Sequence, residues 1–215
     1  MTLSDNSNLW LADELWRLGA IEFGEYTLGR TAVRSPIYLN VRKLIGHPTA
    51  LLRAARVMHE EISTLQGMRH PQMDQFDLVA GVPLGGLHIA TTYSLTAEVP
   101  LIYLHPYHSE DDDKSPIEGV YTPGQRAIIF DDLVTGGGSI LETAERLREA
   151  GLLVKDAFVL VDRQQGARDR LRAAGINLRS ALTLEVLLNH LSASGQIDHD
   201  SYRRSMSYLQ ASRGA

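Results

Sequence analysis

The chain has 215 residues, a formal net charge of −5 and no cysteine. Its 44% hydrophobic and 22% charged residues are typical of a globular protein, and the length fits one α/β domain with small appendages. The acidic balance argues against a nucleic-acid partner, and the lack of cysteine excludes disulfides, thiolate catalysis and zinc–thiolate sites.

Neither a leader nor a membrane segment is recognisable. The first residues lack the basic and apolar regions of a secretion signal, and no apolar run is long enough to span a membrane. We therefore expect a cytoplasmic protein without a membrane partner. No repeat or low-complexity linker divides the chain, so one domain over residues 1–215 is expected.

Hydrophobic periodicity predicts alternating strands and helices. In chain order, the expected elements are helix 9–18, strands and turns over 23–41, helix 49–65, strand 76–82, helix 87–97, strand 100–104, a polar loop over 105–116, strand 126–130, helix 139–150, strand 157–161, helix 167–174, an extended piece near 176–178, and helices 183–192 and 201–209. This alternation predicts a doubly wound parallel sheet. We expect about residues 1–45 to form a small N-terminal cap over its ligand edge.

The most informative segment is 127–139, AIIFDDLVTGGGS. A buried strand here delivers Asp131 and Asp132 to the sheet edge at which ligands of open α/β sheets bind. A turn follows, consisting of Thr135, Gly136, Gly137, Gly138 and Ser139. Its glycines let backbone N–H groups converge on an anion, and the next helix turns its positive end to the same place. Carboxylates suit hydroxyl donors, so the segment predicts a cradle for a ribose 5-phosphate.

Three other interpretations of this segment are weaker. Ser139 and Glu142 match a capping box, but a capping box explains neither the two acids nor the three glycines. The dinucleotide-binding fingerprint fails because Leu141 occupies the place of its third glycine, and no Gly-Lys-Ser/Thr loop occurs anywhere.

Segment 127–139 resembles the phosphoribosyl-pyrophosphate (PRPP) signature of the type I phosphoribosyltransferases. The resemblance implies that Asp131 and Asp132 hold the ribose hydroxyls and that the turn from Thr135 to Ser139 holds the 5-phosphate.

Several further segments, between about residues 15 and 209, resemble one branch of that family, the orotate phosphoribosyltransferases. They are 19–28 (GAIEFGEYTL), 35–42 (SPIYLNVR), 79–86 (VAGVPLGG), 117–119 (IEG) and 161–166 (VDRQQG). This resemblance implies transfer of ribose 5-phosphate from PRPP to orotate, which gives orotidine 5-monophosphate and pyrophosphate. It also implies Mg²⁺ bound mainly through PRPP, and a homodimer.

The resemblance also assigns further residues. Val82, Pro83 and Gly85 belong to the segment that resembles the pyrophosphate loop. Arg163 corresponds to the arginine that holds the orotate carboxylate, and its forked guanidinium suits a carboxylate. Taken alone, Arg163 fits an ion pair with Asp162 or a neighbouring acid better, but the Gln165-Gly166 that follows Asp162-Arg163 favours ligand binding. Tyr38 is expected to pack on the base, or else in the core.

The sequence departs from the family in two cationic segments. The family's lysine after the 19–28 motif is missing, and Arg30 and Arg34 are the candidates to replace it; Arg42 is a further candidate cation for the pyrophosphate. The family's basic lid aligns with 105–114, HPYHSEDDDK, which is acidic. The expected catalytic residues are the two acids of the PRPP signature, Asp131 and Asp132, together with Lys114, the lysine of the 105–114 loop.

The acidic loop keeps other functions open. It favours a catalytically weakened regulator that binds PRPP or a nucleotide, while the PRPP signature also fits a transferase for another base. His105 and His108 beside the acids suggest a metal site, but a solvated loop is the simpler interpretation, and no metal site made by protein side chains alone is expected.

Overall fold

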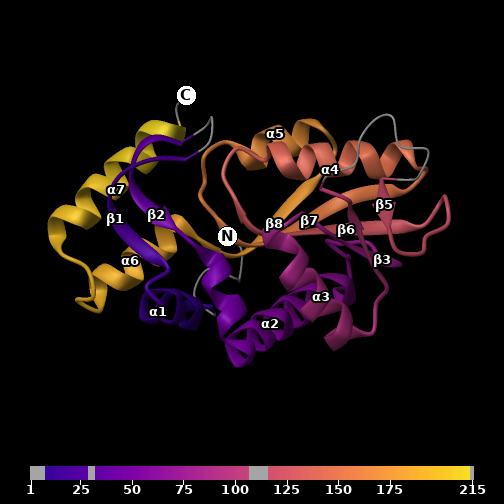
Figure 1. The fold of residues 1–215 in the computed structure, drawn as a ribbon, viewed down its shortest axis with the longest axis horizontal. Coiled ribbons are helices and arrows are strands. Elements are labelled where there is room, and N and C mark those ends of the chain that lie inside the picture. The colour runs from indigo at the N-terminus through magenta and orange to yellow at the C-terminus, as the bar shows by residue number, and fades with distance from the viewer. Residues whose placement is uncertain (1–7, 29–31, 107–115, 214–215) are drawn as a thin grey trace.

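The computed structural model describes residues 8–28, 32–106 and 116–213 (Figure 1). Its helices are α1 (Leu9–Arg17), the 3₁₀ helix η1 (Val41–Gly46), α2 (Pro48–Gly67), α3 (Gly85–Ala97), α4 (Gly138–Glu149), α5 (Ala167–Ala173), α6 (Leu184–Ala193) and α7 (His199–Arg213). Its strands are β1 (Ile21–Leu28), β2 (Ala32–Leu39), β3 (Leu78–Gly81), β4 (Leu101–Leu104), β5 (Ile117–Glu118), β6 (Arg126–Val134), β7 (Leu153–Asp162) and β8 (Asn177–Thr183).

Six strands form the central sheet in the order β5-β4-β3-β6-β7-β8. All neighbours are parallel except the short edge strand β5, which runs antiparallel to β4. The chain proceeds from β3 outward to β4, then returns to place β6 on the other side of β3. This reversal makes the carboxyl ends of β3 and β6 the switch point of the sheet, which is where ligands bind in open α/β folds.

Helices cover both faces of the sheet, as a doubly wound fold requires (Figure 1). Val79, Ile128 and Phe130 face the core that α2 and α3 complete. Alternate residues such as Ala80 and Ile129 face a second core, completed by α4 and α5. Because adjacent residues of a strand point to opposite faces, the near-continuous apolar runs of β3 and β6 fill both cores. The fold class expected from the sequence is confirmed.

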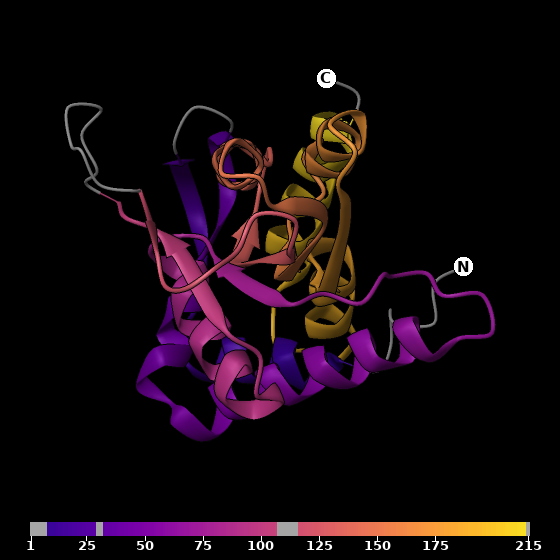
Figure 2. The same cartoon turned by 90° about the vertical axis from the view of Figure 1, so that its right-hand side faces the viewer.

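The N-terminal hairpin is completed by the other end of the chain. β1 and β2 form a separate antiparallel sheet, β2 contacts α7, and α1 contacts α6. In Figure 2 the yellow C-terminal helices lie on the opposite side of the central sheet from the pink β4 edge. The lobe that carries the hairpin is thus built from residues far apart in sequence.

Three strands are longer than expected: β7 begins at Leu153 instead of residue 157, and β6 and β8 are also extended. β6 continues four residues beyond the predicted end at Phe130, because β7 pairs with it as far as Val134–Asp162. The short extended piece expected near 176–178 is the start of β8, which spans Asn177–Thr183 and pairs with β7 along its length. The extensions of β6 and β8 depend on pairing with β7, and the local hydrophobic pattern of a strand gives no information about its pairing partner. No helix in the described ranges is long and apolar enough to cross a membrane.

Candidate functional site at the switch point of the sheet

Asp131 and Asp132 lie within the last part of β6, at the carboxyl edge of the sheet. Asp131 is 8% exposed, and its Oδ1 accepts a hydrogen bond of 2.9 Å from the backbone N–H of Asp132. Oδ1 of Asp132 accepts a bond of 3.0 Å from the N–H of Leu133. These bonds fix both carboxyl groups at the switch point.

Burial raises the pKa of Asp131 well above its ordinary value, and the neighbouring Asp132 carboxyl raises it further. Hydrogen bonds from the backbone of Asp132 and Gly86 oppose the rise but do not cancel it. A buried acid that is costly to ionise without a ligand gains most from hydroxyl or cationic partners.

The loop after β3 lies directly against these acids. The N–H of Val82 donates to the Phe130 carbonyl at 2.9 Å, which joins the loop to β6. A Cβ on Gly85 would overlap the Asp132 carboxylate, and one on Gly86 would overlap the Phe130 carbonyl. Only glycine allows so close an approach. The segment that contains Val82, Pro83 and Gly85 therefore lies beside the two acids. This is the arrangement expected for turns that follow two neighbouring parallel strands.

The turn after β6 lines a cavity of about 600 Å³. The lining residues are Asp131, Leu133, Val134, Thr135, Gly136, Gly137, Gly138, Ser139, Ile140, Glu142 and Arg170. Gly137 has φ +76° and caps α4, so the capping-box alternative is wrong: Ser139 lies inside the helix and makes no cap hydrogen bond. The turn, the helix start and Asp131 thus surround one hollow, as the sequence predicts.

Arg163 follows β7 and is 2% exposed. Its Nη2 donates to Ser35 Oγ at 2.9 Å and weakly to the Ile37 carbonyl at 3.5 Å. Its Nε is buried and has no hydrogen-bond partner among the described residues. Burial lowers the pKa of Arg163, since it disfavours the charged form. A buried cation with only neutral partners is incomplete without an anion.

The expected alternative for Arg163, an ion pair with its neighbour Asp162, does not form. Asp162 is fully buried and pairs with Arg168, whose Nε lies 2.8 Å from its Oδ2. The other Asp162 oxygen accepts from the N–H of Gln164 at 2.7 Å. Asp162 therefore stabilises the loop and leaves the charge of Arg163 uncompensated.

The remaining predicted residues are more dispersed. The Tyr38 ring contacts the Tyr26 ring, with centroids 5.5 Å apart, and β2 alternation directs it away from buried Ser35 and Ile37. Arg34 pairs with Glu25 at 3.3 Å and is 81% exposed, while Arg42 lies exposed in η1. Arg30 and Lys114 lie outside the described residues, as does the loop after Pro106 as far as residue 115. The roles of these residues stay predictions.

Two residues at this edge, Ser35 and Arg170, are not among those that the sequence predicts. Ser35 is fully buried against Arg163, 128 positions away in the sequence. Arg170 lines the 600 Å³ cavity and donates to the Gly136 carbonyl at 3.4 Å. Ser35 starts the family-like segment 35–42, so its Ser-Pro pair carries a signal, whereas Arg170 is one of several arginines on a short helix and carries none.

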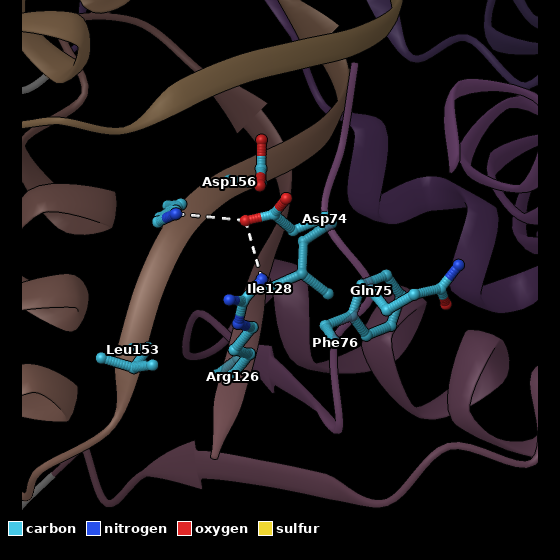
Figure 3. A pocket seen from close by; sticks show the side chains of 9 residues that line it. Asp74, Gln75, Phe76, Arg126, Ile128, Leu153 and Asp156 are labelled. Atoms are coloured by element: carbon cyan, nitrogen blue, oxygen red, sulfur yellow. Dashed lines mark hydrogen bonds and ion pairs between the residues drawn. The ribbon is translucent and has the colours of Figure 1, made fainter. Parts of the chain in front are cut away.

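A second hollow, of about 20 Å³, lies at the opposite edge of the sheet, where β6 and β7 begin. Asp74 lines this hollow and forms ion pairs with two other lining residues, Arg126 at 2.7 Å and Lys155 at 3.1 Å (Figure 3). Burial raises the pKa of Asp156 beside them. Space for one water and internally paired charges indicate a structural contact that ties the segment before β3 to the sheet.

Metal-binding side chains do not gather into a cluster in the described part of the chain. No cluster of three or more His, Asp or Glu side chains is placed there to hold an ion. Asp131 and Asp132 do offer oxygen atoms, the ligand type that Mg²⁺ shares with substrate phosphates. The donor set therefore fits an ion that arrives with a phosphate ligand.

Comparison with known proteins identifies the family. No family model matches the chain. It is 38% identical over 187 residues to the orotate phosphoribosyltransferase of Cenarchaeum symbiosum, which covers 86% of this chain and 90% of that protein. It is 34% identical over 200 residues to the uridine 5'-monophosphate synthase of Bos taurus, covering 93% of this chain but 40% of that longer protein.

A solved structure agrees with these relatives. The orotate phosphoribosyltransferase of Aeropyrum pernix superposes with a TM-score of 0.70 at 31% identity, over 85% of this chain and 99% of that one. The switch-point site, the sequence similarity and the shared fold lead to one conclusion: the chain belongs to the orotate phosphoribosyltransferase family of type I phosphoribosyltransferases.

Proposed function

We propose that the chain transfers ribose 5-phosphate from PRPP to N1 of orotate, a step of pyrimidine nucleotide biosynthesis. The bond from ribose C1 to the pyrophosphate oxygen breaks, the bond from C1 to N1 forms, N1 gives its proton to the solvent, and pyrophosphate leaves. One observation carries this proposal: the glycine-containing turns after β3 and β6 meet Asp131 and Asp132 at the switch point. The buried cation Arg163, which has no acidic partner among the described residues, follows the neighbouring strand β7.

The ribose 5-phosphate half of PRPP fits the β6 edge. The N–H groups of the turn from Thr135 to Ser139, with the positive end of α4, bind the 5-phosphate. Asp131 and Asp132 accept hydrogen bonds from the ribose hydroxyls. Hydroxyl donors compensate the Asp131 carboxylate, whose charge burial disfavours. These two acids are the catalytic residues of the proposal because they hold the ring whose C1 becomes cationic.

The pyrophosphate half fits the loop after β3. Val82, Pro83 and Gly85 place backbone groups next to Asp132, and the missing Cβ of Gly85 lets the Asp132 carboxylate approach the loop closely. Mg²⁺ bound through PRPP would neutralise charge on the leaving group. Asp131 and Asp132, at the carboxyl end of β6, would orient the bound PRPP.

The base half fits Arg163. Its buried guanidinium holds the orotate carboxylate, which supplies the anion that the site lacks. Ser35 and Ile37 hold Nη2 from the hairpin, so the first 45 or so residues cap the base. Tyr38 is the proposed aromatic neighbour of the base. Uracil, without a carboxylate, would leave Arg163 unpaired.

The cations that act on the leaving group are proposed from sequence alone. Arg30 and Arg34 are the candidates for the lysine missing after the 19–28 motif, Arg42 is a further candidate cation, and Lys114 is the cation of the 105–114 loop. The acidic run from Glu110 to Asp113 repels pyrophosphate unless Mg²⁺ intervenes. This loop favours slow turnover, and a binding regulator is the second function that it would fit.

The assembly and location follow the same inference. We propose a homodimer with small-molecule substrates and no nucleic-acid partner, and a cytoplasmic location.

Calorimetry tests the substrate site. The double variant Asp131→Asn with Asp132→Asn should bind PRPP at least about tenfold more weakly, about 1.4 kcal/mol. The exposed acid Asp169, on α5, supplies the control Asp169→Asn, which should bind PRPP as the unmodified chain does. Equal affinity in the folded double variant would remove the proposed site.

A further inference from the structure

Helix α5 supports the turn that lines the 600 Å³ cavity. A Cβ on Gly137 would lie 3.2 Å from Leu171 Cγ and 3.4 Å from the Ala167 Cβ, so one face of α5 packs directly under the turn. Arg170 belongs to the adjacent part of that face. Its Nη1 donates to the Gly136 carbonyl at 3.4 Å and would lie 3.8 Å from a Cβ on Gly138.

Arg170 differs from the other two arginines of α5 in its partner. Arg168 pairs with Asp162 at 2.8 Å, and Arg172 pairs with Asp169 at 3.4 Å. Among the described residues, no carboxylate lies within ion-pair distance of Arg170. Its acceptor is a neutral carbonyl at a distance longer than the usual 2.9–3.0 Å for such bonds. The guanidinium can therefore exchange that acceptor for a better one at little cost.

The charge of the cavity calls for such a cation. Within the described part of its lining, Asp131 and Glu142 are acidic and Arg170 is the one basic side chain. A phosphate monoester carries a charge between about −1.5 and −2 at neutral pH. Turn N–H groups and a helix end supply only partial charges, so they leave much of that charge beside two acids.

We propose that Arg170 is a binding residue for the 5-phosphate of the substrate and product. The inference rests on the proposed function, because it assumes that the turn holds this phosphate. Arg170 turns its fork from the Gly136 carbonyl to the phosphate oxygens, while the turn donates from the opposite side. The charge of Arg170 offsets the repulsion from Glu142 and Asp131 and makes the cavity selective for the phosphorylated ligand.

A purely structural role would use the same side chain as an anchor between α5 and the turn. Arg170→Gln separates the two roles, because its amide keeps an N–H donor for the anchor, on a side chain two bonds shorter, but has no charge. Arg170→Ala removes both, and Arg170→Lys keeps the charge without the fork. Arg172→Ala is the matched control, since Arg172 is an exposed arginine of the same helix that does not line the cavity.

The test compares orotidine 5-monophosphate with orotidine, which lacks the phosphate, by calorimetry at low salt. We expect Arg170→Ala and Arg170→Gln to bind the monophosphate at least about tenfold more weakly while binding orotidine as before, and Arg172→Ala to change neither. Arg170→Lys should lose less, and rising salt should narrow the gap between the unmodified chain and Arg170→Gln.

The possible failures differ. Full affinity for the monophosphate in Arg170→Ala, or its restoration in Arg170→Gln, would overturn the role of Arg170 and leave the proposed function standing. If the unmodified chain binds the monophosphate no better than orotidine, the turn is not a phosphate site, and the proposed function and this inference both fail.

Discussion

The hydroxyl of Ser35 accepts a hydrogen bond of 2.9 Å from Nη2 of Arg163, and so joins the N-terminal hairpin to the loop after β7. The same hydroxyl donates to the Ile37 carbonyl at 2.7 Å and accepts a longer bond of 3.4 Å from the Ile37 N–H, so its shortest accepted bond is the one from the guanidinium. A side chain that is fully buried and has this geometry fixes the orientation of Arg163 before any ligand arrives.

Ser35→Ala should therefore weaken orotate binding about tenfold, since hydrogen bonds to charged groups contribute about 1.5–3 kcal/mol. PRPP affinity should be nearly unchanged. In an Arg163→Ala background the same serine change should have no further effect on orotate, because Ser35 acts through Arg163. Calorimetric titration of the four proteins gives this coupling.

The control is Ser205→Ala, since Ser205 is also fully buried and its Oγ has no hydrogen-bond partner among the described residues. It should leave orotate affinity unchanged. Additive losses from Ser35→Ala and Arg163→Ala would contradict the positioning role.

Asp131→Asn should stabilise the unliganded protein while it weakens substrate binding. The folded-state pKa of Asp131 is raised by burial, so its contribution to stability is complete below the ordinary value of 3.8 and is lost as pH rises through the higher folded value. Asparagine has no such loss, so its advantage in Tm should grow between acid pH and pH 8. A gain of about 1 kcal/mol in unfolding free energy raises the Tm of a chain of this size by about 2–4 °C, and we expect an increase of that order at pH 8.

Thermal melts at pH 4 and pH 8 measure this difference, with Asp169→Asn as the exposed control. A Tm gain that is equal at both pH values would show that the raised pKa of Asp131 is not its cause.

Gly86→Ala should damage both stability and binding. The new methyl group would overlap the Phe130 carbonyl and lie 2.7 Å from the Asp131 Cα, so β6 or α3 must shift. Overpacking of this kind costs about 1–3 kcal/mol, which denaturant titration measures. Gly46→Ala, where nothing lies within 4 Å, is the control and should cost little. An unaltered midpoint in Gly86→Ala would mean that the two turns approach less closely than described.

The acidic sequence of residues 105–114, which aligns with the family's basic lid, leads to a prediction about turnover. Pro106→Lys with Ser109→Lys and Asp111→His restores the family's basic pattern. It should raise kcat at least about tenfold with little change in PRPP affinity, because cations near the leaving group act mainly in the transition state. Turnover of about 10 s⁻¹ in the unmodified chain, a common value for enzymes, would show that other cations already suffice.

The parts of this molecule that sequence predicts well are local. The apolar run before Asp131, the three glycines and the following helix are consecutive, so their order fixes the fold class and one side of the site. The extension of β6 to Val134 and the length of β8 depend on pairing with β7, which has no local signal. The Ser35–Arg163 bond joins residues 128 positions apart, and Arg170 differs from Arg168 and Arg172 only in its spatial neighbours.

The most direct test of the proposed reaction is product formation from PRPP, orotate and Mg²⁺. Chromatography should show orotidine 5-monophosphate and pyrophosphate appearing in equal amounts, even if slowly. Uracil in place of orotate should give no nucleotide, and the Asp131→Asn, Asp132→Asn double variant should be inactive. If the unmodified chain binds both substrates yet forms no orotidine 5-monophosphate over hours, or uses uracil equally well, the proposed function is contradicted.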